Sequence, residues 1–407
     1  MKVFQVALGI LAAIGGFVDI GDIVFNVAAG AAFGYELLWV VVVGVVGIIV
    51  YSEMCGRVAA VSNKAVFDTV RERVGFGAGL VTLVAAGVVT LMTLAAEIGG
   101  IAICLQLLSA MSYRWLVLFA VVALAVVVWI TPFEWIERIF GYGGLCLLVF
   151  AVAAYKLHPD WGAVAHGFVP SISSGDRLVY VFFAIGLLGA AMTPYEVYFY
   201  SSGGVEEEWT PKDIGVNRAN AIVGYGLGGI LSCLLMIVGG ALFLPHGIEP
   251  ESLGTVALGG EVPLGTIGLL LALLGILFAV SGAAIDTLFA GAYNIAQFFG
   301  WEWGRYRTNA GAPRFTLSWM VILVLALLVV LTGVDPIQLT EYAVIFSVVA
   351  LPLTYLPILL VANDRAYMGA HANGRLANTL GIVYLVVILV VAVSAIPLMI
   401  LTNVGQG

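Results

Sequence analysis

The sequence predicts an all-α polytopic membrane protein with a single transmembrane domain over residues 1–407. Hydrophobic residues make up 62% of the chain and charged residues only 10%, whereas soluble proteins contain about 25% charged residues. Glycine is abundant, with 50 residues, as expected where helices pack closely in lipid. Apolar stretches long enough to cross a bilayer recur along the whole chain.

The same composition argues against several functional classes. The chain has no run of basic residues, so no nucleic-acid partner is expected. It has no nucleophile–base constellation or metal-hydrolase spacing, so we expect neither an enzyme nor a cofactor. The lipid bilayer is the expected surrounding, and no obligate protein partner is evident. The four cysteines are dispersed without a CxxC pair, which is typical of apolar packing positions.

Eleven apolar stretches are candidate membrane spans. The first and the sixth are interrupted, near residues 19–22 and near residue 193. The stretch at 263–299 is too long for one straight span, so we expect part of it to extend into the cytoplasm as an amphipathic tail. The eleven stretches are 3–33, 35–54, 77–109, 115–132, 138–156, 178–202, 218–244, 263–299, 314–333, 339–361 and 376–403.

Basic residues predict the orientation, because cytoplasmic loops of membrane proteins are enriched in lysine and arginine. A cytoplasmic N-terminus places 13 basic residues inside, including Lys2, and only Arg114, Lys156 and Arg177 outside. Eleven spans then place the C-terminus outside. The compact loops favour a bacterial inner (plasma) membrane.

The two interrupted helices predict an internal repeat. Asp19 and Thr193 lie 174 residues apart, and four complete spans separate the two helices. Because five is an odd number of helices, the second repeat is inverted relative to the first. We expect repeats at 1–156 and 178–361, with 376–403 as an additional helix 11. Interrupted helices in corresponding positions of two halves point to the substrate site of a transporter.

Two acidic residues mark the first interruption. Asp19 and Asp22 flank Gly21, which permits an unusual backbone. A carboxylate at the centre of a membrane helix costs roughly 2.5–3.5 kcal/mol, and no lysine or arginine lies in the middle of any predicted span. Two nearby carboxylates repel, so either one is protonated or a divalent cation lies between them. The alternative is that each pairs with a basic residue of another helix.

A Thr-Pro pair marks the second interruption. Pro194 cannot donate to the helical ladder and releases a carbonyl near Ala190. Thr193 offers a hydroxyl group, and Tyr195 and Glu196 follow. A proline kink can be purely structural, but here it lies opposite the aspartate pair of the other half.

Other polar residues within the spans are weaker candidates. Glu97 and Asp286 are intramembrane acids that could support the metal ligands without binding the ion, act as proton sites, or form polar contacts between helices. Glu53 is expected at a solvated helix end, and Asn26 is expected to hydrogen-bond across helices. The four histidines fall in loops, at His158, His166, His246 and His371.

The donor set indicates the class of metal. Carboxylate, hydroxyl and carbonyl oxygens are hard ligands that suit Mg²⁺, Ca²⁺ or Mn²⁺. Only Met192 adds a soft atom near either interruption, one position before the threonine of the turn. The sequence does not rank the three ions.

These residues resemble the Nramp family of divalent-metal transporters. The family carries Asp-Pro-Gly-Asn in helix 1, followed by a run like NVAAGAAFGYELLWV at 26–40 here. In helix 6 it carries Met-Pro-His-Asn, where this chain has Thr193 to Glu196. The AEIGG stretch in helix 3 and the eleven spans extend the resemblance over most of the chain. It implies a LeuT-like fold of 5+5 helices, with Asp19, Asp22, Thr193 and the Ala190 carbonyl as metal ligands.

The chain also departs from the family pattern. Ile20 replaces the proline and Asp22 replaces the asparagine ligand. Thr193 replaces the methionine whose thioether is thought to favour transition metals, and Tyr195 replaces a histidine associated with proton movement. Leu94 replaces one of an acidic pair and leaves Glu97, and Ala350 occupies the place of a glutamine ligand in helix 10. These departures are similar to the Nramp-related magnesium transporters.

We therefore expect a carrier for Mg²⁺, and also Mn²⁺, that works by alternating access without tight proton coupling. Glu97 and Glu196 would add negative potential to the site. One alternative is a proton-coupled Mn²⁺/Fe²⁺ transporter, since the retained acids could carry protons. Another is a carrier of amino acids or other organic solutes on the same fold, although Asp19 and Asp22 would repel a substrate carboxylate.

Overall fold

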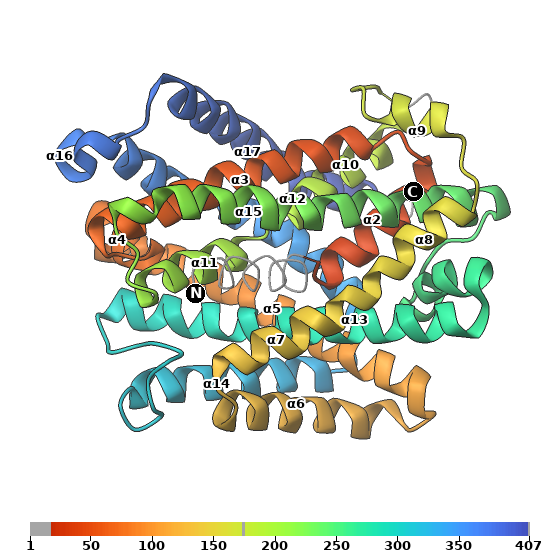
Figure 1. Cartoon of the computed structure of the whole chain (residues 1–407), viewed down its shortest axis with the longest axis horizontal. Helices are drawn as coiled ribbons and strands as arrows, with labels where there is room; N and C mark the ends of the chain where they lie inside the picture. The colour runs from red at the N-terminus through yellow and green to blue at the C-terminus, as the bar shows by residue number, and fades with distance from the viewer. Residues whose placement is uncertain (1–17, 173–175, 406–407) are drawn as a thin grey trace.

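The computed structural model describes residues 18–172 and 176–405, and every regular element in these residues is helical. The α-helices are α2 (Ile20–Phe33), α3 (Leu38–Ser62), α4 (Val66–Val74), α5 (Phe76–Ser109), α6 (Tyr113–Ile130), α7 (Phe133–Gly144), α8 (Val149–Lys156), α9 (Trp161–Gly167), α10 (Arg177–Ala191), α11 (Pro194–Glu206), α12 (Ile214–Val238), α13 (Leu253–Phe299), α14 (Pro313–Leu331), α15 (Pro336–Asn363), α16 (Arg365–Met368) and α17 (Arg375–Leu401). The long helices follow the long axis of the molecule, with α4 and α16 at one end and α9 at the other (Figure 1).

Ten helical spans among the described residues are long and apolar enough to cross a membrane. One of them, Arg177–Glu206, combines α10 and α11. The shorter apolar helix α2, of 14 residues, occupies the place of the first predicted span. Residues 3–17 of the first predicted span, 3–33, lie outside the described residues. So does Lys2, which was counted among the cytoplasmic basic residues. The all-α polytopic fold with an interrupted helix 6 is therefore confirmed. The part of helix 1 that precedes its predicted interruption lies outside the described residues.

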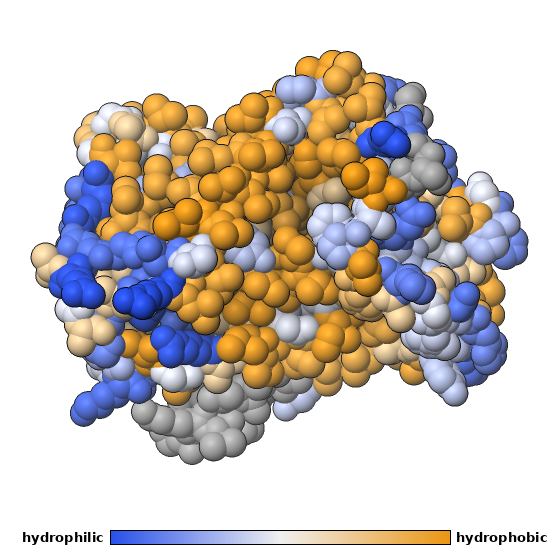
Figure 2. All heavy atoms as spheres, turned by 90° about the horizontal axis from the view of Figure 1, so that it is seen from above, coloured by the Kyte–Doolittle hydropathy of each residue, from blue (hydrophilic) through white to orange (hydrophobic). Residues whose placement is uncertain are grey.

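The outer surface is apolar where lipid would contact it. The face seen in Figure 2 carries a broad apolar band between two more hydrophilic ends. Large apolar side chains such as Trp115, Ile130 and Val393 are 68%, 70% and 76% exposed. Helices satisfy their own backbone hydrogen bonds, so they can present such faces to hydrocarbon. The chain is thus an integral membrane bundle.

The longest helix differs from its prediction. α13 runs for 47 residues, but Gly265 has φ 66° and ψ −158°, so two helical segments meet there at a sharp kink. The segments fold back closely, because a Cβ atom at Gly260 would lie 2.7 Å from the carbonyl oxygen of Gly268. Ala296 and Phe298 near the other end are buried. The predicted amphipathic tail is therefore wrong: after Gly265 one helix runs on to Phe299, and residues 253–262, before the kink, were not part of the predicted span.

Glycine contacts place α2 directly against the end of α12. A methyl group at Gly30 would collide with the carbonyl oxygen of Met236, and one at Gly239 would collide with that of Val27. Gly239 begins a short π-helical segment, Gly239–Phe243, that continues α12. The two backbones touch, so α12 side chains can reach the polar residues of α2.

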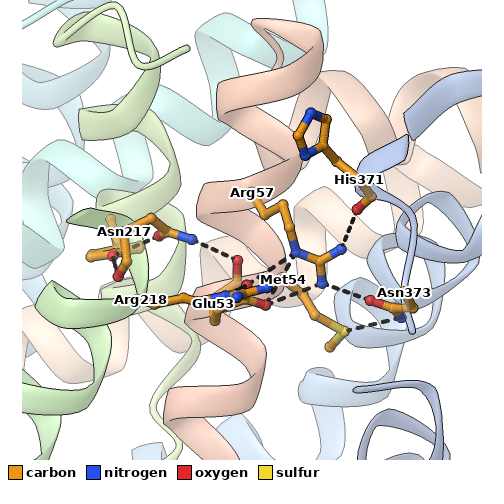
Figure 3. Close-up of polar contacts among 8 residues, drawn as sticks. Glu53, Met54, Arg57, Asn217, Arg218, His371 and Asn373 are labelled. Carbon is orange, nitrogen blue, oxygen red and sulfur yellow. Dashed lines mark hydrogen bonds and ion pairs between the residues drawn. The ribbon is translucent and has the colours of Figure 1, made fainter. Parts of the chain in front are cut away.

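A polar network ties together three segments at the end of the molecule that carries α4 and α16 (Figure 3). Arg57 donates to the Glu53 carboxylate through Nε at 3.1 Å, to the carbonyl oxygen of His371 at 2.7 Å and to Asn373 Oδ1 at 2.6 Å. Arg218, on α12, donates to the same carboxylate at 3.0 Å. Because α3 continues beyond residue 54, the Glu53 side chain is only 16% exposed. The expectation of a solvated helix end is wrong.

Candidate functional site

The first interruption places Asp19 at the start of a half-helix. Asp19 is the N-cap residue of α2, and its Oδ1 atom accepts a hydrogen bond from the Asp22 backbone N–H at 2.9 Å. The first N–H groups of a helix have no partner within the helix, so a capping carboxylate satisfies one of them. Asp19 and Asp22 are buried, and α2 begins near the middle of the long axis (Figure 1). α2 thus begins at the aspartate pair, where the sequence predicted the interruption of helix 1; the residues before Val18 lie outside the described residues.

The second interruption separates α10 from α11. α10 ends at Ala191, and Thr193 is the extended N-cap residue of α11, with Pro194 as its first helical residue. Proline is favoured there because its missing N–H would have had no helical partner. The Thr193 hydroxyl donates to the Ala190 carbonyl oxygen at 2.6 Å. The Thr193 hydroxyl and the Ala190 carbonyl, the two oxygen donors proposed at this break, therefore lie next to each other. The Ala190 carbonyl already accepts the hydrogen bond from Thr193.

The two interruptions meet at a small cavity. The Tyr195 hydroxyl donates to Asp19 Oδ2 at 3.3 Å, which connects α11 to the start of α2. Asp19 and Thr193 both line the cavity. The remaining lining residues come from α2, α5 and α15: Ile20, Gly21, Thr93, Ala96, Thr340, Ala343, Val344 and Ser347.

Three of these lining residues were not anticipated from the sequence. Thr93, Thr340 and Ser347 bear hydroxyl groups and come from two helices, α5 and α15. On α15 the sequence comparison pointed to Ala350, whereas Ser347 lines the cavity instead. The only sequence signal for these cavity residues was an isolated serine or threonine within an apolar helix. That signal is weak, because many such hydroxyl groups donate only to a backbone carbonyl of their own helix. Thr340 and Ser347 do bond backbone carbonyl oxygens of their own helix, those of Pro336 and Val344.

Asp22 is held in different surroundings from Asp19. Its Oδ1 atom accepts hydrogen bonds from Asn26 Nδ2 and from the Ser232 hydroxyl of α12, each at 3.3 Å. Its Oδ2 atom has no hydrogen-bond partner among the described residues. Asp22 does not line the cavity. Asn26, expected to bond across helices, bonds its own helix instead.

The weaker candidates occupy separate positions around these two carboxylates. Glu97 on α5 accepts a hydrogen bond from the Thr287 hydroxyl of α13 at 3.3 Å. Glu196 lies in the first turn of α11, is 7% exposed, and has no hydrogen-bond partner for either carboxylate oxygen among the described residues. Asp286 is half-buried on α13, beside Thr287. Of the predicted set, the structure gathers Asp19, Thr193, Tyr195 and the Ala190 carbonyl most closely.

The chemistry of these donors is hard and oxygen-based. None of the ion pairs in the described part of the chain involves Asp19 or Asp22, so the alternative of a basic partner finds no support there. Met192 is fully buried against α3, where a methyl group at Gly47 would lie 2.5 Å from its sulfur. Residues 18–172 and 176–405 contain no group of three or more His, Cys, Asp or Glu residues able to hold a metal. Any cation here would therefore use hydroxyl and carbonyl oxygens, or water, beside the carboxylates.

Comparisons with known proteins give a consistent result. The family model described as natural resistance-associated macrophage protein-like (Nramp) matches residues 9–397. The divalent metal cation transporter MntH of Deinococcus radiodurans is 25% identical over 394 residues, which covers 92% of this chain and 85% of that protein. The curated relatives that match include MntH of Latilactobacillus sakei, at 26% identity over 389 residues, 90% of this chain and 82% of that protein.

Among solved structures, a manganese transporter of Eremococcus coleocola in complex with an aromatic bis-isothiourea compound has a TM-score of 0.76. It is 18% identical, and the match covers 98% of this chain and 94% of that chain. Below 25% identity, this likeness supports the fold alone.

Proposed function

The chain belongs to the Nramp family, and from this premise we propose that it carries divalent metal cations across a membrane. The observation that carries the proposal is the pair of buried aspartates at the break of the first helix, neither of which has a basic partner in the described residues. A transported divalent cation would supply the missing positive charge. The relatives named as divalent metal cation transporters support the same function. Transport, rather than catalysis, is then the activity of this chain.

We further propose Mg²⁺ as the main substrate, with Mn²⁺ also accepted. The ligands would be Asp19, Asp22, Thr193 and the Ala190 carbonyl, with water completing the shell. Mg²⁺ prefers oxygen ligands and loses its waters reluctantly, so a site with few fixed donors suits a partly hydrated ion. The Met192 sulfur packs against α3, which supports a site without a soft ligand.

Transport without tight proton coupling is the next part of the proposal. Tyr195 stands where the family carries a histidine, and its hydroxyl donates to Asp19. Of the four histidines, only His158 lies in a loop as predicted; His166, His246 and His371 lie in short helices, and none of the four lies in α2, α10 or α11. Without an imidazole at the site, the membrane potential would drive entry, by about 2.3 kcal/mol per charge per 100 mV.

Alternating access between two inverted repeats is the proposed mechanism. The repeats would be residues 1–156 and 178–361, with 376–403 as an additional helix. The N-terminus would be cytoplasmic and the C-terminus external, in a bacterial inner membrane. The cavity lining from α15 comes from its first half, Thr340–Ser347, whereas the Arg57 network lies beyond the other end of α15.

The direct test is uptake by the purified protein in liposomes. Mg²⁺ and Mn²⁺ should each enter protein-containing vesicles faster than protein-free vesicles when an inside-negative potential is applied. No entry of either ion at any potential would contradict the proposed function.

Manganese import coupled to protons is the second candidate. The solved structural neighbour is named a manganese transporter, and buried Glu97 and Glu196 offer carboxylates that could carry protons. Acidification of the vesicle interior that depends on Mn²⁺ would favour this candidate.

A further inference from the structure

The two oxygens of the Asp22 carboxylate differ in their surroundings. Oδ1 accepts two hydrogen bonds, from Asn26 and from Ser232, whereas Oδ2 has no partner among the described residues. We propose that the hydrogen bonds from Ser232 and Asn26 fix the Asp22 carboxylate so that only Oδ2 can bind a cation, and that this restriction to one oxygen excludes Ca²⁺. The inference rests on the proposed transport of divalent cations and adds residues that determine its specificity.

This restriction of Asp22 is built into the packing of α2 against α12. Asn26 is fixed by a second bond, since its Nδ2 atom also donates to the Asp22 carbonyl oxygen at 2.8 Å. Asn26 and Ser232 are 1% and 0% exposed, so bulk water does not compete for the carboxylate. Ser232 cannot withdraw easily, because the glycine contacts at Gly30 and Gly239 keep the two backbones together.

Asp19 is restricted in a similar way. Its Oδ1 atom accepts from the Asp22 backbone and its Oδ2 atom accepts from Tyr195. Each Asp19 oxygen therefore carries one hydrogen bond already. Bidentate coordination of one cation by either aspartate would require both oxygens of that carboxylate to turn toward the ion together.

The ions differ in what they require from such carboxylates. Ca²⁺ takes six to eight oxygen ligands at about 2.3–2.6 Å and often binds a carboxylate through both oxygens. Mg²⁺ takes six ligands at about 2.0–2.1 Å, keeps several waters and is commonly bound by one or two carboxylates. The Asp22 carboxylate, in which two hydrogen-bond donors occupy Oδ1, can therefore bind Mg²⁺ through Oδ2 alone. Release of Oδ1 would allow the bidentate contact that Ca²⁺ prefers.

The experiment compares Ca²⁺ and Mn²⁺ uptake by variants in liposomes. Ser232→Ala removes one donor, Asn26→Ala removes the other, and Ser232→Thr keeps the hydroxyl as the matched control. We expect each alanine variant to raise the ratio of Ca²⁺ to Mn²⁺ uptake, in kcat/KM, by about tenfold, the equivalent of one hydrogen bond to a charged group. Ser232→Thr should keep the wild-type ratio.

The ratio separates this role from a merely structural one, because misfolding lowers the uptake of both ions together. An unchanged ratio in whichever alanine variants fold, as judged by size-exclusion chromatography, would overturn the inference. So would wild-type protein that takes up Ca²⁺ as readily as Mn²⁺. If the wild type moves no divalent cation, the proposed function fails together with the inference, whereas normal Mn²⁺ uptake with an unchanged ratio removes the inference alone.

Discussion

Asp19 and Asp22 are one helical turn apart, yet their carboxylates have different neighbours. Asp19 caps α2 and lines the cavity with Thr193, while Asp22 bonds to Ser232 on α12. Both are buried in a region that a lipid bilayer would surround. Removing a buried carboxylate that binds no protein cation should cost function more than stability.

Alanine substitution of either aspartate tests this difference. We expect Asp19→Ala and Asp22→Ala each to reduce Mn²⁺ uptake to the level of protein-free liposomes, because each removes a charged ligand. Both variants should remain folded in detergent, although Asp19→Ala also removes the N-cap of α2, which costs about 0.5–2 kcal/mol. Glu249→Ala, which changes an exposed loop acid, is the control and should transport normally. Wild-type uptake by either aspartate variant would remove that residue from the site.

Thr193→Met tests the argument from ligand softness. A thioether is a soft donor that Mg²⁺ binds poorly, so this variant should lower Mg²⁺ uptake relative to Mn²⁺ uptake. A competition series with both ions would measure the ratio. If that ratio stays at the wild-type value, the chemistry of residue 193 does not set the preference.

The stability of the folded protein should depend on pH through Asp68, which lies on the short helix α4 outside the membrane spans. Burial raises the pKa of Asp68 to about 6, although its hydrogen bond with the Ala65 backbone N–H opposes the shift. A raised pKa means that the folded state binds the proton more tightly than the unfolded state does. Asp68 therefore lowers stability as the pH rises from about 4 to about 6, and the cost persists above that range.

Asp68→Asn should remove this cost. We expect the variant to be more stable than wild type by about 1–3 kcal/mol at pH 8 and equally stable below pH 4. Thermal unfolding in detergent over this pH range would measure the difference. A gain of the same size at every pH would contradict the assignment to Asp68 ionisation.

At the scale of helices, hydropathy predicted the elements well. The predicted spans at 77–109 and 376–403 match α5 and α17 closely, the Thr-Pro pair marked the break between α10 and α11, and the aspartate pair marked the start of α2. These features are local, because apolar length and backbone chemistry lie within one segment. The short helices α4, α9 and α16 and the kink at Gly265 were not predicted.

The partners of the site residues could not be predicted in the same way. Ser232 meets Asp22 across 210 positions of sequence, and Tyr195 meets Asp19 across 176. Such pairs depend on how the helices pack, which no local pattern encodes. Serine and tyrosine are common in membrane helices, so neither residue type signals a contact by itself. The sequence therefore indicated the two breaks but not the separate surroundings of the two aspartates.

Gly30→Ala tests the contact between α2 and α12. The added methyl group would collide with the Met236 carbonyl oxygen, which is backbone and cannot rotate away. We expect a loss of about 1–3 kcal/mol of stability, together with reduced uptake. Gly226→Ala on α12 is the control, because its methyl group would meet no atom within 4 Å. It should be neutral or slightly stabilising. Equal behaviour of the two variants would contradict the close packing.

At the scale of the whole molecule, the proposed site lies within the helical bundle. The start of α2 and the break between α10 and α11 both line one cavity inside the bundle. Residues of α5 and α15 complete the lining of this cavity. At one end of the molecule, Arg57 on α3 donates hydrogen bonds to the His371 carbonyl oxygen and to Asn373, and Glu53 on α3 accepts one from Arg218 on α12 (Figure 3). These bonds join segments that are distant in sequence.

The central claim is that the protein moves a hard divalent cation without a proton. The most direct test is a proteoliposome assay with one dye for internal Mg²⁺ and another for internal pH, under an inside-negative potential. The account predicts that Mg²⁺ enters while the internal pH stays constant. Absence of Mg²⁺ entry, together with internal acidification driven by Mn²⁺, would contradict it and assign the protein to proton-coupled transition-metal transport.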